Sequence, residues 1–110
     1  MPDELWELAA PLIPAFAPRP QGGGTAPADD RAVFTAIVYV LTSGCAWRHL
    51  PGEFGVSRAT AHRRFAAWTR AGLWPRLHRA VLDELGARDL VDWSAAIVDA
   101  AAVRAKKGAR

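Results

Sequence analysis

The stretch that decides the fold is residues 55–74, which read GVSRATAHRRFAAWTRAGLW. Ser57 stands where an N-cap belongs, because its hydroxyl can accept a hydrogen bond from a backbone N–H of the first turn. Gly72 stands where a helix ends. Between them runs an apolar seam at spacings of four and three residues, formed by Ala61, Phe65 and Trp68. The sequence therefore predicts an amphipathic helix over residues 57–71.

The opposite face of this helix combines small side chains with arginines. It carries Ala59, Arg63, Ala66 and Arg70. Small residues allow close approach to a DNA groove, and arginine binds guanine edges or phosphates. Arg64 lies nearer the apolar seam and is suited either to a phosphate or to an intramolecular partner. We predict DNA contacts from Arg58, Thr60, His62, Arg63, Arg64 and Arg70.

Charge is distributed unevenly along the 110 residues, whose net charge is +3. Residues 1–53 hold three arginines against six acids, and residues 83–110 hold five basic and five acidic residues. Residues 54–82 hold six arginines and no acid. An acid-free basic block indicates a polyanionic partner, whereas a merely solvated helix face would normally mix both signs.

Composition is typical of one globular domain that can bury a core without disulfides or metals. The single cysteine, Cys45, excludes an intramolecular disulfide and a multi-cysteine zinc site. No apolar run approaches the ~18 residues of a membrane span, and the N-terminus is acidic rather than a basic signal region. We therefore expect a cytoplasmic protein. The five tryptophans are expected to anchor the core rather than to stack on bases.

Residues 1–28 predict a helix followed by a linker. The helix is expected within residues 1–13, and its last turn should end or become irregular at Pro11, which does not fit a helix interior. Residues 14–28 contain four prolines and three consecutive glycines, a composition typical of a linker.

A helix-turn-helix-like DNA-binding domain is predicted over residues 29–94. A core helix capped by Asp29 or Asp30 runs to about Ser43 and stops at Gly44, a turn follows, and the helix over residues 57–71 comes last. This is the layout in which the last helix enters the major groove. A further helix is expected over residues 74–85, and residues 87–94 read as a polar connection.

The C-terminal part predicts a short strand and a loose tail. Ala96–Asp99 reads as a β-strand that ends on a carboxylate, and the residues from Arg104 read as a loose basic tail. A carboxylate at a strand end can bind a metal ion, but metal-dependent phosphoryl chemistry needs two or three of them. From the residues alone, a capping role for Asp99 is favoured. The expected fold class is mainly α: a small helical bundle with a helix-turn-helix-like unit, a short C-terminal strand and a loose tail.

Several motifs resemble the N-terminal region of bacterial transposases of the insertion-sequence-five type. The most specific are Gly-Cys-x-Trp-Arg-x-Leu-Pro over residues 44–51 and Arg-Arg-Phe-x-x-Trp over residues 63–68. The resemblance covers nearly the whole chain. It implies a helical DNA-binding domain that recognises the terminal inverted repeats of a mobile element.

In full-length relatives a ribonuclease-H-like catalytic domain follows, with three acidic residues that bind Mg²⁺ or Mn²⁺. Asp99 matches the first of these aspartates, so the resemblance implies a catalytic and metal-binding role for it. Residues 95–110 would then be the truncated start of that domain. Because the chain ends before the other two acids, we expect it neither to cut DNA by itself nor to use a cofactor of its own.

Two explanations of the early end stay open. The chain is either the upstream-frame product of a two-frame element or a relic of a decayed element. Lys106-Lys107-Gly108 is codable by a run of A followed by G, which would suit ribosomal slippage.

The sequence thus predicts the DNA-binding portion of a transposase, acting in DNA transposition and catalytically incomplete alone. Its expected partner is double-stranded DNA in the nucleoid, with full-length transposase or a second copy as further candidates, and neither a membrane nor a small-molecule substrate. The alternative is an interaction fragment that modulates full-length transposase through residues 74–85 or the tail. A working nuclease is disfavoured, since only Asp99 of the required acids is present.

Overall fold

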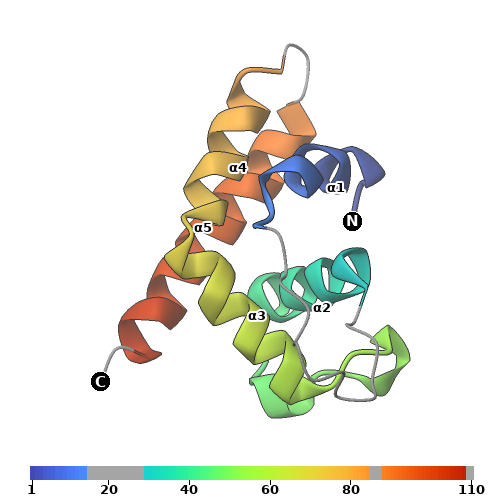
Figure 1. Ribbon diagram of the computed structural model, residues 1–110. Coiled ribbons are helices and arrows are strands. Elements are labelled where there is room, and N and C mark those ends of the chain that lie inside the picture. Colours follow the sequence, from blue (N-terminus) through green and yellow to red (C-terminus); the bar gives the residue numbers. More distant parts are fainter. Residues whose placement is uncertain (15–28, 85–87, 109–110) are drawn as a thin grey trace.

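The computed structural model describes residues 1–14, 29–84 and 88–108. Helices dominate these ranges, and no strand occurs in them, so the mainly α fold class is confirmed. None of the helices within them is both long and apolar enough to cross a membrane. The elements shown in Figure 1 are α1 (Asp3–Ala9), η1 (Ala10–Leu12), α2 (Asp30–Ser43), η2 (Trp47–His49), η3 (Gly52–Phe54), α3 (Arg58–Arg70), α4 (Leu73–Leu82) and α5 (Arg88–Gly108), where η marks a 3₁₀ turn.

The ends of α2 and α3 follow the capping residues read from the sequence. The Asp29 carboxylate accepts a hydrogen bond from the Ala32 N–H at 3.0 Å, and the Ser57 hydroxyl accepts one from the Thr60 N–H at 3.1 Å. Gly44 closes α2 with φ at 76°, a left-handed conformation that a side chain would strain. In α1 the regular helix stops at Ala9 and continues as a 3₁₀ turn through Pro11, as predicted.

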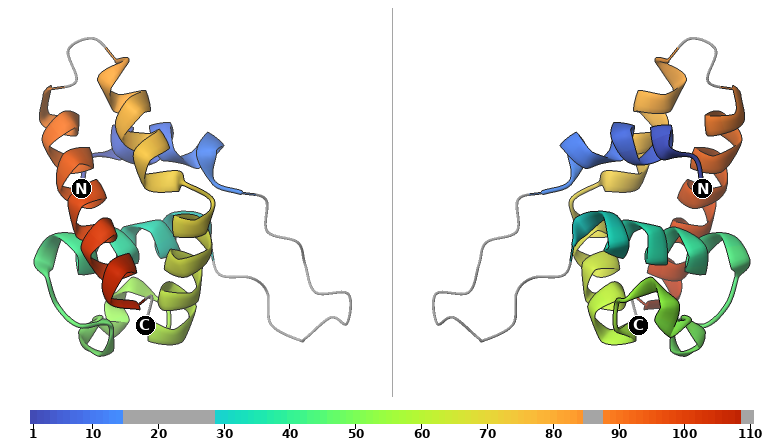
Figure 2. Two further views of the ribbon diagram at one scale, coloured as in Figure 1. Left: turned by 90° about the vertical axis from the view of Figure 1, so that its left-hand side faces the viewer. Right: turned by 90° about the vertical axis from the view of Figure 1, so that its right-hand side faces the viewer.

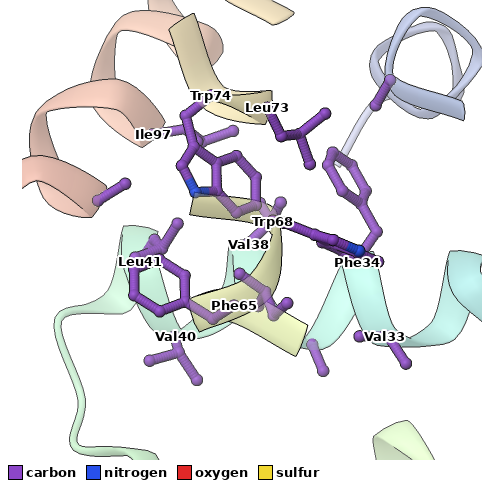
Figure 3. Close-up of a cluster of buried hydrophobic side chains, with 14 of the residues drawn as sticks. Val33, Phe34, Val38, Val40, Leu41, Phe65, Trp68, Leu73, Trp74 and Ile97 are labelled. Atoms are coloured by element: carbon purple, nitrogen blue, oxygen red, sulfur yellow. The ribbon is translucent and has the colours of Figure 1, made fainter. Parts of the chain in front are cut away.

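Trp74, at the start of α4, lies at the centre of the core (Figure 3). Its ring stacks with Phe34 of α2 at 6.3 Å and with Phe65 of α3 at 6.0 Å between centroids. Its indole N–H donates a hydrogen bond to the Thr69 hydroxyl at 2.9 Å, so its polar atom is satisfied. Trp68 packs edge-on to it at 6.4 Å. One aromatic cluster therefore joins three helices. The expectation that tryptophans anchor the core is confirmed for Trp68 and Trp74, whereas Trp6, Trp47 and Trp93 are half-buried and pack against the core.

The hairpin formed by α4 and α5 packs against the pair formed by α2 and α3 (Figures 1 and 2). α4 and α5 run antiparallel side by side, and α1 packs on α4. α2 contacts α3 on one side and the C-terminal half of α5 on another. An ion pair between Asp3 and Arg31, at 2.6 Å, adds a link between α1 and α2.

The predictions for the C-terminal part are wrong. The expected strand Ala96–Asp99, the polar connection from residue 88 and the start of the loose tail all lie within α5. Alanine, the best helix former, is frequent here. A seam at spacings of four, three and four residues is buried in the core, formed by Leu90, Ser94, Ile97 and Ala101.

The domain limits at residues 29, 94 and 95 stay predictions. The linker predicted over residues 14–28 lies, apart from Pro14, outside the residues that the structure describes.

Candidate nucleic-acid interface

α3 has an inward face that is buried and an outward face that is exposed. Ala61, Phe65 and Trp68 lie in the core, as their spacing predicted. On the other side Ala59, His62, Arg63 and Arg70 are exposed. The helix therefore presents small and basic side chains to solvent on a rigidly anchored backbone.

The first turns of α3 hold a chain of side-chain hydrogen bonds. The Ser57 hydroxyl lies 2.9 Å from that of Thr60, and Arg63 Nη2 donates to the Thr60 hydroxyl at 3.3 Å. Arg58 Nη1 donates to the Arg48 carbonyl in η2 at 3.2 Å. The structure thus brings Thr60 and Arg63 together and holds Arg58 against the preceding turn.

Arg64 points the other way, into the molecule. Only 8% of it is exposed, and its Nη1 donates to the Asp30 carboxylate at 2.8 Å. This ion pair joins the first turn of α2 to the middle of α3. Of the two roles that the sequence left open for Arg64, the structure supports the intramolecular one.

His62 and Arg70 complete the predicted set. His62 is exposed, and its ring lies edge-on to Trp47 of η2, with centroids 5.3 Å apart. Arg70 is exposed in the last turn of α3. Beyond it, α4 adds the exposed Arg76 and Arg79. Neither α3 nor α4 contains an acidic residue, so no carboxylate of their own offsets these arginines.

Asp99 is exposed on α5 rather than on α3. The Mg²⁺ or Mn²⁺ implied by the family resemblance needs several such ligands in one place. Within the described ranges no three His, Cys, Asp or Glu side chains come close enough to hold a metal ion. The residues present there do not fit the metal site.

Arg104 is a contact that the sequence reading missed. It lies on α5, and its Nη2 donates to the Cys45 carbonyl at 2.6 Å and to the Val40 carbonyl at 3.4 Å. Its guanidinium carbon lies 5.5 Å from the centre of the Trp47 ring. The signal was present in the sequence, because Arg104 stands three residues after Ala101 and so continues the buried seam of α5.

Comparison with known proteins gives the family. Residues 1–78 match the family described as "Putative transposase of IS4/5 family (DUF4096)". The chain is also 45% identical over 105 residues to "Insertion element IS402 uncharacterized 16.2 kDa protein" of Burkholderia cepacia, which covers 94% of this chain and 71% of that protein. No solved structure matches the chain. The chain belongs to the IS4/5 family of insertion-sequence transposases, and the resemblance read from its motifs is confirmed.

Proposed function

We propose that this chain is the DNA-binding portion of an insertion-sequence transposase and that it recognises the terminal inverted repeats of its element. The observation that carries the proposal is the outward face of α3, where exposed arginines alternate with small residues and no acid is present. Membership of a transposase family supports it, because such proteins act on DNA. The place of action would be DNA of the cytoplasmic nucleoid.

The arrangement of α2, the intervening turn and α3 supports a helix-turn-helix-like unit. α3 packs on α2, and the Arg64–Asp30 ion pair ties the two helices together. The connection contains η2 and η3, so it is longer than the 3–4-residue turn of the simplest motif. In this proposal α3 is the helix that enters the major groove, which is wide enough for one α-helix.

The spacing of the outward arginines fits a groove. Arg63 and Arg70 are seven residues apart, which is about 10 Å along a helix axis. With a base-pair rise of about 3.4 Å, this distance spans roughly three base pairs if α3 lies along the groove. Arg63 and Arg70 are assigned to base edges or phosphates, Arg58 to a phosphate, and Thr60 and His62 to the flanks of the contact.

We do not propose that this chain cuts DNA by itself. Asp99, matched to a catalytic acid by resemblance, lies on an exposed face of α5 away from any cluster of ligands in the described ranges. Mg²⁺ or Mn²⁺ would belong to a complete transposase that supplies the remaining acids.

Fluorescence anisotropy with a terminal-repeat duplex and a scrambled duplex of the same length tests the proposal. Arg63→Ala and Arg70→Ala should each weaken binding to the repeat by ~1–3 kcal/mol. Arg31→Ala is the matched control, because it removes the same charge from an arginine of α2 that pairs with Asp3 of α1. Binding should also weaken with added salt.

Unchanged affinity in both α3 variants, with unchanged circular dichroism, would reject α3 as the recognition helix. If the wild-type chain binds neither duplex but co-purifies with full-length transposase, the alternative role as an interaction fragment is supported instead.

A further inference from the structure

The end of α5 contacts the turn that leads into α3. Arg104 is the residue that makes this contact, through the Cys45 carbonyl at 2.6 Å and the Val40 carbonyl at 3.4 Å. Val40 lies in the last turn of α2, and Cys45 follows the Gly44 cap. The Cys45 carbonyl lies just beyond the end of α2, and the Val40 carbonyl already accepts the Gly44 N–H at 3.1 Å, so the guanidinium supplies a donor mainly to Cys45.

The same guanidinium also packs on Trp47. Its carbon lies 5.5 Å from the ring centre, within the range of a cation–π contact. Trp47 in turn touches α3 twice, at His62 on the exposed side and at Phe65 on the buried side, each with centroids 5.3 Å apart. A continuous set of contacts therefore runs from α5, through Trp47, to the face of α3 assigned to DNA.

Arginine suits this position better than lysine. A planar guanidinium can donate to a carbonyl with its edge while its face rests on an aromatic ring, and an ammonium group lacks this fork. Arg104 is also partly buried, so the contact is screened less by salt than a surface pair would be.

We propose that Arg104 is a positioning residue for the DNA-binding face: it holds Trp47 against α3 and thereby couples the placement of α5 to the affinity of α3 for DNA. The inference rests on the proposed function, since it names a determinant of the same binding site. Arg104 itself need not touch DNA. A partner that draws the end of α5 away would weaken DNA binding by the same route.

The test compares Arg104→Gln with Arg31→Gln on the terminal-repeat duplex. Both variants lose one positive charge, and both lose a contact between helices, but Arg31 pairs with Asp3 and makes no contact with Trp47. Arg104→Gln should weaken binding roughly 3- to 30-fold more than Arg31→Gln does. Arg104→Lys, which keeps the charge near the ring, should recover part of the loss.

A second readout follows the Trp47 ring without DNA. Fluorine NMR of protein labelled with fluorotryptophan resolves the indoles, and loss of one resonance in Trp47→Phe assigns Trp47. The Trp47 resonance should move in Arg104→Gln and stay in place in Arg31→Gln.

Four results would overturn the inference. Equal weakening of DNA binding in Arg104→Gln and Arg31→Gln, with normal wild-type binding, overturns this inference but not the proposed function. A Trp47 resonance that does not move in Arg104→Gln has the same consequence. Failure of the wild-type chain to bind either duplex overturns the proposed function and this inference together. If Arg104→Gln does not fold, Arg104→Lys carries the test: wild-type affinity and an unmoved Trp47 resonance in that variant overturn the inference.

Discussion

The two faces of α3 both carry arginine, but in opposite environments. Arg63 is exposed on the outer face, whereas Arg64, its neighbour in sequence, is buried and paired with Asp30 at 2.8 Å. One residue step turns a helix by about 100°, which is enough to move a guanidinium from solvent to the interior. Position around the helix, rather than residue type, therefore decides which arginine stabilises the fold and which is exposed to solvent.

The largest expected effect lies on the inward face. Trp68 is 3% exposed and packs against Trp74. Trp68→Ala removes a large ring from the core and should lower the free energy of unfolding by ~3–5 kcal/mol, measured by urea denaturation. Arg70→Ala, on the exposed side of the same helix, serves as the control and should change stability by less than ~0.5 kcal/mol. Similar losses in the two variants would contradict the division into faces.

A matched pair of substitutions compares the two arginines directly. Arg64→Met should lower the free energy of unfolding by ~1–2 kcal/mol, since it removes a charge-assisted hydrogen bond whose acceptor is only half-buried. Arg63→Met should leave stability within ~0.5 kcal/mol of wild type but weaken DNA binding. Thermal unfolding and anisotropy on the same samples separate the two effects. A stability loss in Arg63→Met as large as that in Arg64→Met would count against the comparison.

Substitution of the N-cap of α3 is expected to give an effect of intermediate size. Ser57 accepts a hydrogen bond from the Thr60 N–H at 3.1 Å. Ser57→Ala should destabilise the protein by about 1 kcal/mol, and Ser57→Asp, which also caps, should restore most of that loss in chemical denaturation. Equal stability of the alanine and aspartate variants would show that the cap contributes nothing measurable.

The smallest effect is expected at Asp99, on α5. Asp99 is exposed. Asp99→Asn should therefore change the free energy of unfolding by less than ~0.5 kcal/mol and the affinity for the duplex by less than about twofold. Calorimetry measures the first quantity and anisotropy the second. A marked change in either would mean that Asp99 has a role in this chain that its exposed position does not indicate.

Local signals in the sequence were sufficient to predict the bounds of α2 and α3 but not the helical state of α5. Asp29, Ser57 and the terminal glycines mark the ends of α2 and α3 because caps act within one turn. α5 was misread because its seam is made of small residues: Ser94 and Ala101 are buried without being strongly apolar. The run of β-branched residues at Ile97 and Val98 then favoured a strand on local propensity, which tertiary packing overrides.

The exposed residues of the candidate site were predictable from the sequence, whereas the partners of Arg64 and Arg104 were not. The exposed positions of His62, Arg63 and Arg70 follow from helical periodicity. The partner of Arg64 is Asp30, 34 residues away, and that of Arg104 is Cys45, 59 residues away. No local pattern specifies such pairings, since they depend on how the helices pack.

Trp74 has a consequence for how the molecule unfolds. Its ring stacks on Phe34 of α2 and Phe65 of α3, while its own backbone begins α4. Separating any one of these helices exposes the same indole and removes contacts from the other two. Partial opening is therefore costly in this region, and the amide protons of α2, α3 and α4 should exchange with solvent mainly through one cooperative event.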